Sequence, residues 1–277
     1  MSFIVPESGQ VLGIDVGWSE KKKTTGACVL KWDARVVTLG LDRIATADSL
    51  QVERLAPGEV LALAVDGPLR GALDEIGVYR DAEMMLTRGF AARIGKPGQS
   101  SSGNGRKLNA AANAVVRAAL SGLQIARSQH DARIHELAVA EAFPTSFLGV
   151  MLDEGCVPAH GRRSDAYYLH LLGPSSTQPP ALPSDRLRGL IAKLLPGRQI
   201  AADLAAVQDH EERAALICAV TALCVACRKY VAVGDPENGY IVLPPKAAAG
   251  EPGLQPWAWS VIEANRKTNG TARVVVE

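Results

Sequence analysis

Residues 11–17 have the sequence VLGIDVG, an apolar run that ends in Asp15 and a glycine turn. Apolar residues on both sides of a single carboxylate are typical of a buried central strand whose aspartate emerges at the sheet edge. Residues 60–68, VLALAVDGP, repeat this design around Asp66. One such aspartate is more often a simple turn at a strand end. Two of them at the same end of neighbouring strands predict a site for two-metal phosphoryl chemistry.

Length and composition favour a single α/β domain that spans residues 1–277. With 47% hydrophobic residues among 277, the chain is long enough to bury one large core. The 30 basic and 29 acidic residues give a formal charge of +1. A nucleic-acid partner would therefore have to be held by local basic loops, and the charge balance neither supports nor excludes a nuclease.

Cysteine use and the N-terminal residues bear on location. Five cysteines, an odd number without a framework spacing, fit a reducing compartment better than a secreted one. The first ten residues, MSFIVPESGQ, lack a basic start followed by an apolar signal core. Because no apolar run reaches the length of about 18 residues that a membrane span requires, we expect a cytoplasmic protein without a membrane partner.

The rest of the chain alternates between strand and helix patterns, which predicts a mixed sheet flanked by helices. Strands are expected at residues 26–32, 35–41 and 135–142, the first two forming an antiparallel unit with residues 11–17. Helices are expected at residues 47–55, 80–88, 107–126, 145–152, 163–172, 185–195 and 211–230. Loops are expected at 95–106 and 173–183, and a turn with a short strand at 234–245. Helical insertions thus fall at about 143–200.

Acidic side chains recur at the ends of the predicted strands and at the start of one helix. They are Asp15, Asp66 and Glu141 at strand ends, and Asp209, Glu211 and Glu212 before the helix at 211–230. Ligands of open α/β sheets gather outside the carboxyl ends of strands. Carboxylates collected there repel one another and are usually neutralised by divalent cations, so Mg²⁺ or Mn²⁺ is the expected occupant. Alternatively, the last three acids only favour a helix N-terminus electrostatically.

Basic residues near these acids are candidates for holding a polyanionic substrate. They are Lys21, Lys22 and Lys23 after the first strand, and Lys96, Arg106 and Lys107 around the glycine-rich loop. Both groups are placed to reach phosphates. The plainer interpretation is that each is a solvated charge on a loop, which is common for lysine.

Other side chains fit less specific roles. His210 stands beside the acidic cluster and could tune a metal-bound water, although capping or surface exposure explains it equally. Trp257 and Trp259 could stack on bases or pack a terminal strand. Cys224 and Cys227 lie in an apolar helix without a second pair, which favours packing over zinc binding.

Five segments of the chain carry a family resemblance. They are GIDVG at 13–17, VDGP at 65–68, EAFPTSF at 141–147, DHEERAALICAVTAL at 209–223 and GDPENGYIVLPP at 234–245. In this order they resemble the ribonuclease-H-like predicted nuclease family called domain-of-unknown-function family 429. The resemblance covers nearly the whole chain and implies a ribonuclease-H-like fold.

The family resemblance also implies roles for individual acids. Asp15 would bridge metal ions, with Asp66 and Glu141 as further ligands and an acid of the last core helix closing the site. Related proteins commonly have an aspartate just before the alanine-leucine segment of that helix, where this chain has Ala214. This departure leaves the fourth ligand open among Asp209, Glu211 and Glu212.

The resulting hypothesis is a metal-dependent nuclease of ribonuclease-H-like fold that acts on DNA, RNA or a branched substrate. One alternative is an ATP-using enzyme of the actin and sugar-kinase superfamily, whose opening strand and glycine turn look much like residues 13–17. Such proteins normally enclose a nucleotide between two domains, which argues against it. A second alternative, motivated by Ala214, is a catalytically inactive nucleic-acid-binding protein. A homodimer is compatible with the sequence.

Overall fold

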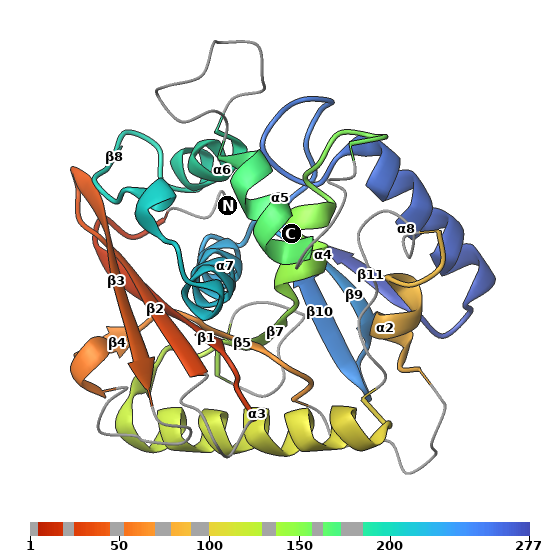
Figure 1. Cartoon of the computed structure of the whole chain (residues 1–277), viewed down its shortest axis with the longest axis horizontal. Coiled ribbons are helices and arrows are strands. Elements are labelled where there is room, and N and C mark those ends of the chain that lie inside the picture. Colours follow the sequence, from red (N-terminus) through yellow and green to blue (C-terminus); the bar gives the residue numbers. More distant parts are fainter. Residues whose placement is uncertain are drawn as a thin grey trace.

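The computed structural model describes residues 5–18, 25–44, 53–69, 79–89, 100–128, 137–156, 163–172 and 185–277. In these residues the chain forms an α/β fold with a large mixed sheet and helices on both faces (Figure 1). The nine strands of the sheet follow the order β11-β9-β10-β7-β5-β1-β2-β3-β8. The α/β class and the mixed sheet expected from the sequence are confirmed.

The centre of the sheet is built from five strands. β1 (Gly9–Asp15), β2 (Thr25–Trp32) and β3 (Val36–Ile44) form the expected antiparallel unit. β5 (Leu63–Asp66) then pairs with β1, and β7 (Val139–Ala142) with β5, both in parallel. β1, β5 and β7 therefore end at the same edge of the sheet, which is the edge that the aspartate pattern predicts.

The remaining strands extend both sides of the sheet. The hairpin of β9 (Val231–Asp235) and β10 (Gly239–Leu243) joins β7 through a parallel pair, and β11 (Arg273–Val276) pairs with β9. On the other side, β8 (Gln199–Ile200) pairs with β3. The predicted strand at residues 60–66 is divided, because β4 (Glu59–Val60) pairs with β6 (Gln124–Ile125) in a separate small sheet.

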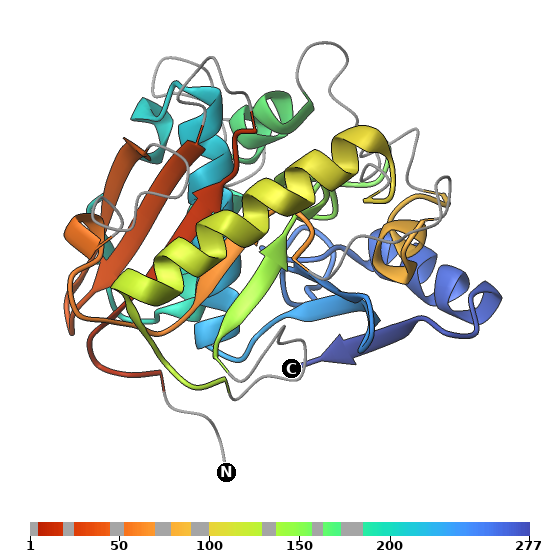
Figure 2. The ribbon, with the colours of Figure 1, turned by 90° about the horizontal axis from the view of Figure 1, so that it is seen from below.

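Helices cover the two faces of the sheet unequally. The 20-residue helix α3 (Gly103–Gly122) runs across one face, as Figure 2 shows, and α7 (His210–Ala226) lies on the other face (Figure 1). Beside α7 lie α4 (Pro144–Gly149), α5 (Arg163–Leu171) and α6 (Arg186–Leu194). α7 is apolar nearly all round because neighbouring helices and the sheet enclose it, so 13 of its 17 residues are buried.

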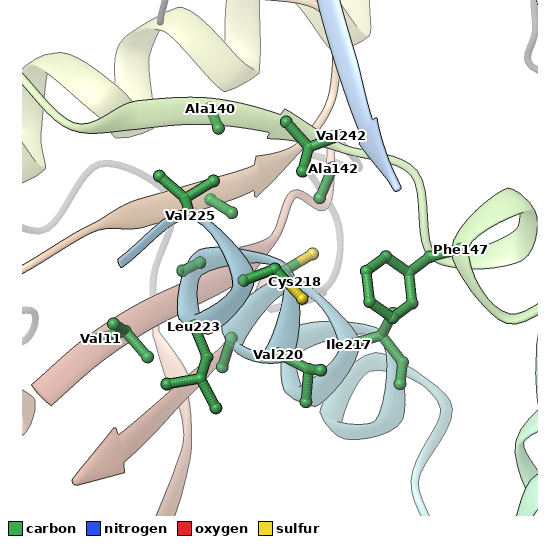
Figure 3. Close-up of a cluster of buried hydrophobic side chains, with 14 of the residues drawn as sticks. Val11, Ala140, Ala142, Phe147, Ile217, Cys218, Val220, Leu223, Val225 and Val242 are labelled. Carbon is green, nitrogen blue, oxygen red and sulfur yellow. The ribbon is translucent and has the colours of Figure 1, made fainter. Parts of the chain in front are cut away.

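Two glycines allow α7 to rest directly on the sheet. A methyl group at Gly13 would come within 2.0 Å of the backbone nitrogen of Ala219, and one at Gly26 within 2.5 Å of the carbonyl oxygen of Glu211. Figure 3 shows the apolar side chains around this contact, with Cys218 on the same side as Ala142 of β7. The close approach fixes the start of α7 beside the C-terminal ends of β1 and β5.

The other helix predictions were right in type and differ in extent. α3 begins at Gly103, four residues earlier than expected, because Ser102 caps it through a hydrogen bond from Gly105 N. α2 (Asp81–Met85) is shorter than the predicted helix at 80–88. Trp257 and Trp259 lie in a helix, α8 (Pro256–Thr268), so their assignment to a terminal strand was wrong. Most of the predicted helix at 47–55 and the loop at 173–183 lie outside the described residues.

Among the described helices, none has both the length and the apolar composition that crossing a membrane would require.

Candidate active site

Asp15 and Asp66 lie side by side where β1 and β5 end. The parallel register pairs the two residues directly, and paired residues project their side chains from the same face of a sheet. Their carboxyl groups interact closely enough for each to change the pKa of the other. The predicted convergence of these two aspartates is therefore observed. We call them the carboxyl pair.

The surroundings of the carboxyl pair disfavour its charge. Burial raises the pKa of Asp15 well above its ordinary range, and the charges of Asp66, Glu211 and Asp209 raise it further. Burial also raises the pKa of Asp66 to about 7, although the hydrogen bond from Asp15 and the charge of His210 act in the opposite direction. A bound cation would relieve this penalty, because an opposite charge favours the ionised form.

The start of α7 brings further charges to the carboxyl pair. Asp209 caps the helix, and its Oδ1 accepts hydrogen bonds of 3.1 Å from the backbone nitrogens of both Glu211 and Glu212. Arg43 of β3 forms ion pairs with Asp209 and Glu211. Although burial raises the pKa of Asp209, the hydrogen bonds and Arg43 lower it below its ordinary value. The negative charges of Asp209 and Glu211 thus act on the carboxyl pair, and Asp209 also caps the N-terminus of α7.

His210 joins the site through a contact that the sequence does not reveal. Its Nδ1 lies 3.0 Å from Oδ1 of Asp165 in α5, and Arg213 Nη1 lies 3.5 Å from the same oxygen. The charge of His210 also acts on Asp66, so His210 is close to both Asp165 and the carboxyl pair. Asp165 is 45 residues away from His210, and no spacing rule links them.

The helix face toward the pair carries an alanine. Residues four apart share a face of a helix, so His210, Ala214 and Cys218 lie in one row along α7. Charges of Asp15 and Asp66 raise the pKa of Cys218, in addition to the larger effect of burial, which places this row beside the pair. Ala214 provides no carboxylate in this row, whereas Glu211, one turn earlier on α7, acts on Asp15 through its charge.

Glu141 does not join the carboxyl pair, contrary to the sequence prediction. In the register of β5 and β7 it lies opposite Val65, whereas Ala142 lies opposite Asp66. Neighbouring residues on a strand point to opposite faces. Figure 3 shows Ala140 and Ala142 on the side of α7, so the side chain of Glu141 projects toward the face that α3 covers.

On that face, Glu141 is neutralised by an arginine. Arg80 Nη1 and Nη2 lie 3.0 and 3.1 Å from its two carboxylate oxygens, and Leu69 N donates to Oε1 at 2.7 Å. Arg80 Nε also binds Glu83 at 2.9 Å, and Ser100 donates to Glu83 through both its nitrogen and its hydroxyl. We call Arg80, Glu83 and Glu141 the Arg80 cluster; all three are buried.

The predicted phosphate-binding residues are described only in part. Lys21, Lys22, Lys23 and Lys96 lie outside the described residues. Arg106 and Lys107 lie in the first turns of α3, where Arg106 Nε donates to Ser101 O at 3.1 Å. Lys107 Nζ lies 5.8 Å from the ring centroid of Trp18, which directly follows the glycine turn after Asp15.

The donor set suits Mg²⁺ or Mn²⁺ bound largely through water and substrate. Within the described ranges, no three His, Cys, Asp or Glu side chains lie close enough together to hold a metal ion by themselves. Mg²⁺ usually keeps several waters and binds one or two carboxylates plus phosphate oxygens, so a protein cage is unnecessary. The carboxyl pair provides two such ligands, and Glu211 is a further acid near the site, whereas Glu212 is linked to it through its backbone nitrogen, which donates to Asp209.

Comparison of the chain with family models, with curated proteins and with solved structures found no match.

Proposed function

We propose that the protein is a divalent-cation-dependent phosphodiesterase that cleaves nucleic acid at the carboxyl pair. The observation that carries this proposal is the contact between two aspartates at the ends of adjacent parallel strands, both with raised pKa values. Without a cation such a pair is costly in the folded state. Acids whose pKa values are raised by burial and by neighbouring like charges are typical of functional sites.

The strand arrangement gives independent support. Three antiparallel strands followed by two parallel ones, in the order β3-β2-β1-β5-β7, are the arrangement expected of a ribonuclease-H-like core, which supports this part of the proposal. α3 connects β5 to β7 on one face, and α7 follows later on the other face. In that fold the first-strand aspartate and an acid of the last core helix share metal ions, and these positions correspond to Asp15 and the start of α7.

In this proposal, the acidic residues bind the cation and the basic residues bind the substrate. Asp15 and Asp66 would hold Mg²⁺ or Mn²⁺ through their carboxylate oxygens, with any proton on either carboxyl group released to solvent. Divalent ions in such sites lower the pKa of a bound water and stabilise the leaving oxygen of a phosphodiester. Arg106 and Lys107, on the side of the sheet edge that α3 covers, attract the substrate backbone.

The test is cleavage of labelled DNA and RNA oligonucleotides with Mg²⁺, with Mn²⁺ and with a chelator. Asp15→Asn and Asp66→Asn should each lower the rate at least about a hundredfold, the scale on which one charge-stabilising group acts in catalysis. Asp42→Asn is the matched control, because Asp42 is an exposed aspartate of β3. Cleavage that persists in both variants, or in the chelator, contradicts the proposal.

Ala214 favours a second candidate, a nucleic-acid-binding protein without turnover. Ala214 provides no carboxylate at the position where related proteins commonly have an aspartate, so only the acids at the start of α7, such as Glu211, are available from this helix. The same experiment separates the two functions. Oligonucleotide binding without any Mg²⁺- or Mn²⁺-dependent cleavage supports the binding protein, and ATP hydrolysis without oligonucleotide binding supports the kinase-like alternative.

A further inference from the structure

A cavity of about 200 Å³ lies next to the carboxyl pair, between the first turn of α3 and the ends of β5 and β7. Asp66 and the two residues after it form one wall, so anything bound in the cavity is adjacent to the proposed reaction site. Figures 1 and 2 show this N-terminal, yellow end of α3 on the side of α2. The volume is below the range of roughly 300–1,000 Å³ typical of pockets for drug-sized ligands, which indicates a smaller occupant.

The inner end of the cavity accepts hydrogen bonds and is negatively charged. It is lined by the Arg80 cluster, in which one guanidinium faces two carboxylates, leaving an excess of one negative charge. The guanidinium of Arg80 already donates hydrogen bonds to both acids and, at 2.8 Å, to the carbonyl oxygen of Asn238, so these donors are not available to a ligand. A phosphate would be repelled from this end, whereas a neutral group with N–H donors would be favoured.

The walls of the cavity are apolar and partly aromatic. Phe143, Leu108, Ile241 and Pro68 contribute to them. A flat, weakly polar ring can contact such walls with both faces while its edge carries polar groups. Planar bases that leave a nucleic-acid stack are bound in this manner, by apolar contacts on the faces and hydrogen bonds on the edge.

The mouth of the cavity has the opposite charge from its inner end. Trp18, 46% exposed, lies there, and Lys107 stands over its ring at 5.8 Å. The first turn of α3 contains no acidic residue, and its N-terminal N–H groups carry a partial positive charge. A phosphate is therefore favoured at the mouth, and the polarity of the cavity fits a nucleotide with its base inward and its phosphate outward.

We propose that this cavity binds one unpaired nucleobase of the substrate, with an amino or ring N–H directed at Oε2 of Glu141, which also accepts from Arg80. The inference rests on the proposed function and specifies its substrate: single-stranded or locally opened nucleic acid, with the phosphate of the bound nucleotide close to the carboxyl pair. A fully paired duplex cannot supply such a base without first opening.

The test fills the cavity from an exposed position. Asn104 lies in the first turn of α3 and lines the cavity, so Asn104→Trp occludes it without disturbing the core. Ala110→Trp, at an exposed site of the same helix away from the cavity, is the matched control. Trp18→Ala removes the aromatic ring at the mouth as a second variant. Thermal unfolding of each variant checks that the fold is retained.

The readout is binding of a labelled single-stranded oligonucleotide and of the matched duplex, with Ca²⁺ in place of Mg²⁺. Asn104→Trp and Trp18→Ala should each raise the Kd for the single strand about tenfold, the effect of losing one stacked base, while Ala110→Trp changes it less than twofold. An abasic nucleotide at one position should weaken binding to the wild type and not to Asn104→Trp. Equal single-strand affinities of Asn104→Trp and Ala110→Trp overturn the inference.

A second readout separates this inference from the proposed function. Adenosine and cytidine, which carry no phosphate, are titrated against the fluorescence of the wild-type protein and of Asn104→Trp. Saturable binding that Asn104→Trp abolishes supports the base pocket even where no oligonucleotide is cleaved, in which case the phosphodiesterase proposal fails alone. If oligonucleotides are cleaved, nucleosides do not bind and Asn104→Trp has no effect, the phosphodiesterase proposal stands and the base-pocket proposal fails.

Discussion

The two faces of the sheet each hold a pair of acids, and the two pairs are treated in opposite ways. On the α3 face, Glu83 and Glu141 share Arg80 and also accept hydrogen bonds from backbone nitrogens. On the α7 face, Asp15 and Asp66 have mainly each other, and further negative charges stand nearby. The guanidinium of Arg80 neutralises Glu83 and Glu141. We propose that a bound divalent cation neutralises the carboxyl pair.

This difference separates structural acids from functional ones. Glu141 and Glu83 raise the pKa of Arg80 above its ordinary value although burial lowers it, which means that the cluster is stabilised in its fully charged state. For the carboxyl pair the opposite holds, because burial raises the pKa values of both aspartates and disfavours their charged forms. Removing charge should therefore weaken the fold on the α3 face and strengthen it on the α7 face.

The largest effect should come from Arg80→Met. This substitution leaves two buried carboxylates without their cation, and the loss of one partner from a buried ion pair costs about 3–5 kcal/mol. We expect the free energy of unfolding, measured by urea denaturation at neutral pH, to fall by about 4 kcal/mol. Arg88→Met, on the turn after α2, is the control and should change it by less than about 0.5 kcal/mol. A similar stability of both variants would show that the cluster is not structural.

Glu141→Gln should have a smaller but still large effect on the same cluster. Arg80 keeps Glu83 as a partner, so we expect a loss of about 2–3 kcal/mol in the free energy of unfolding. Because Glu141 lies on the face away from the carboxyl pair, the Mg²⁺ concentration that gives half-maximal cleavage at saturating substrate should stay unchanged. A shift of that Mg²⁺ concentration by tenfold or more would indicate that Glu141 is a metal ligand after all.

The misplacement of Glu141 shows where the sequence stops being informative. A central parallel strand is apolar on both faces, so its pattern does not alternate and the direction of a single acid is not encoded in it. The strands at residues 11–15 and 63–66 could be aligned because each ends in Asp-X-Gly or Asp-Gly, and the observed register pairs Asp15 with Asp66. Residue 141 is one position out of step with them, and a shift of one residue changes the face.

The sequence also did not predict which residues form ion pairs or hydrogen bonds with the acids. Arg80 and Glu83 have the spacing of an i,i+3 pair within a helix start, but Glu141 is 61 residues away from Arg80. His210 was noticed only as a neighbour of acids in the sequence, whereas Asp165 in α5 is what holds it. Patterns along the chain thus predicted the central strands, most of the helices and the pair of aspartates. The helix α8, the outer strands β8 and β11 and the long-range ion pairs required three-dimensional structure.

The carboxyl pair predicts an unusual dependence of stability on pH. The pKa of Asp66 is about 7 in the folded protein and about 4 in an unfolded chain, so the folded state holds its proton more tightly. Stability contributed by this group is present below pH 4 and is lost as pH rises toward 7. We expect the free energy of unfolding of the metal-free protein to fall by on the order of 4 kcal/mol across this range, because three pKa units correspond to about 4 kcal/mol, and to fall less in Asp66→Asn.

Divalent cation should reverse this loss. At pH 8, Mg²⁺ at about 100 times its Kd should raise the free energy of unfolding by about 2.7 kcal/mol in the wild type. In Asp66→Asn the Mg²⁺ effect should be absent, and the metal-free variant should be more stable than the metal-free wild type at this pH. If thermal unfolding shows the same Mg²⁺ response in both proteins, the carboxyl pair is not the cation site.

The smallest effect should come from Arg43→Ala, which supplies the sharpest contrast with Arg80. Arg43 also serves two acids, Asp209 and Glu211, but its side chain is 41% exposed and water already screens the three charges. We expect a loss below about 1 kcal/mol that shrinks further in high salt. The variant should instead act on cation binding, because Asp209 and Glu211 then present their full charge to the carboxyl pair, and the Mg²⁺ midpoint should fall about twofold. A stability loss as large as that of Arg80→Met would mean that exposure does not distinguish the two arginines, and the contrast between the faces would have to be explained by something other than burial.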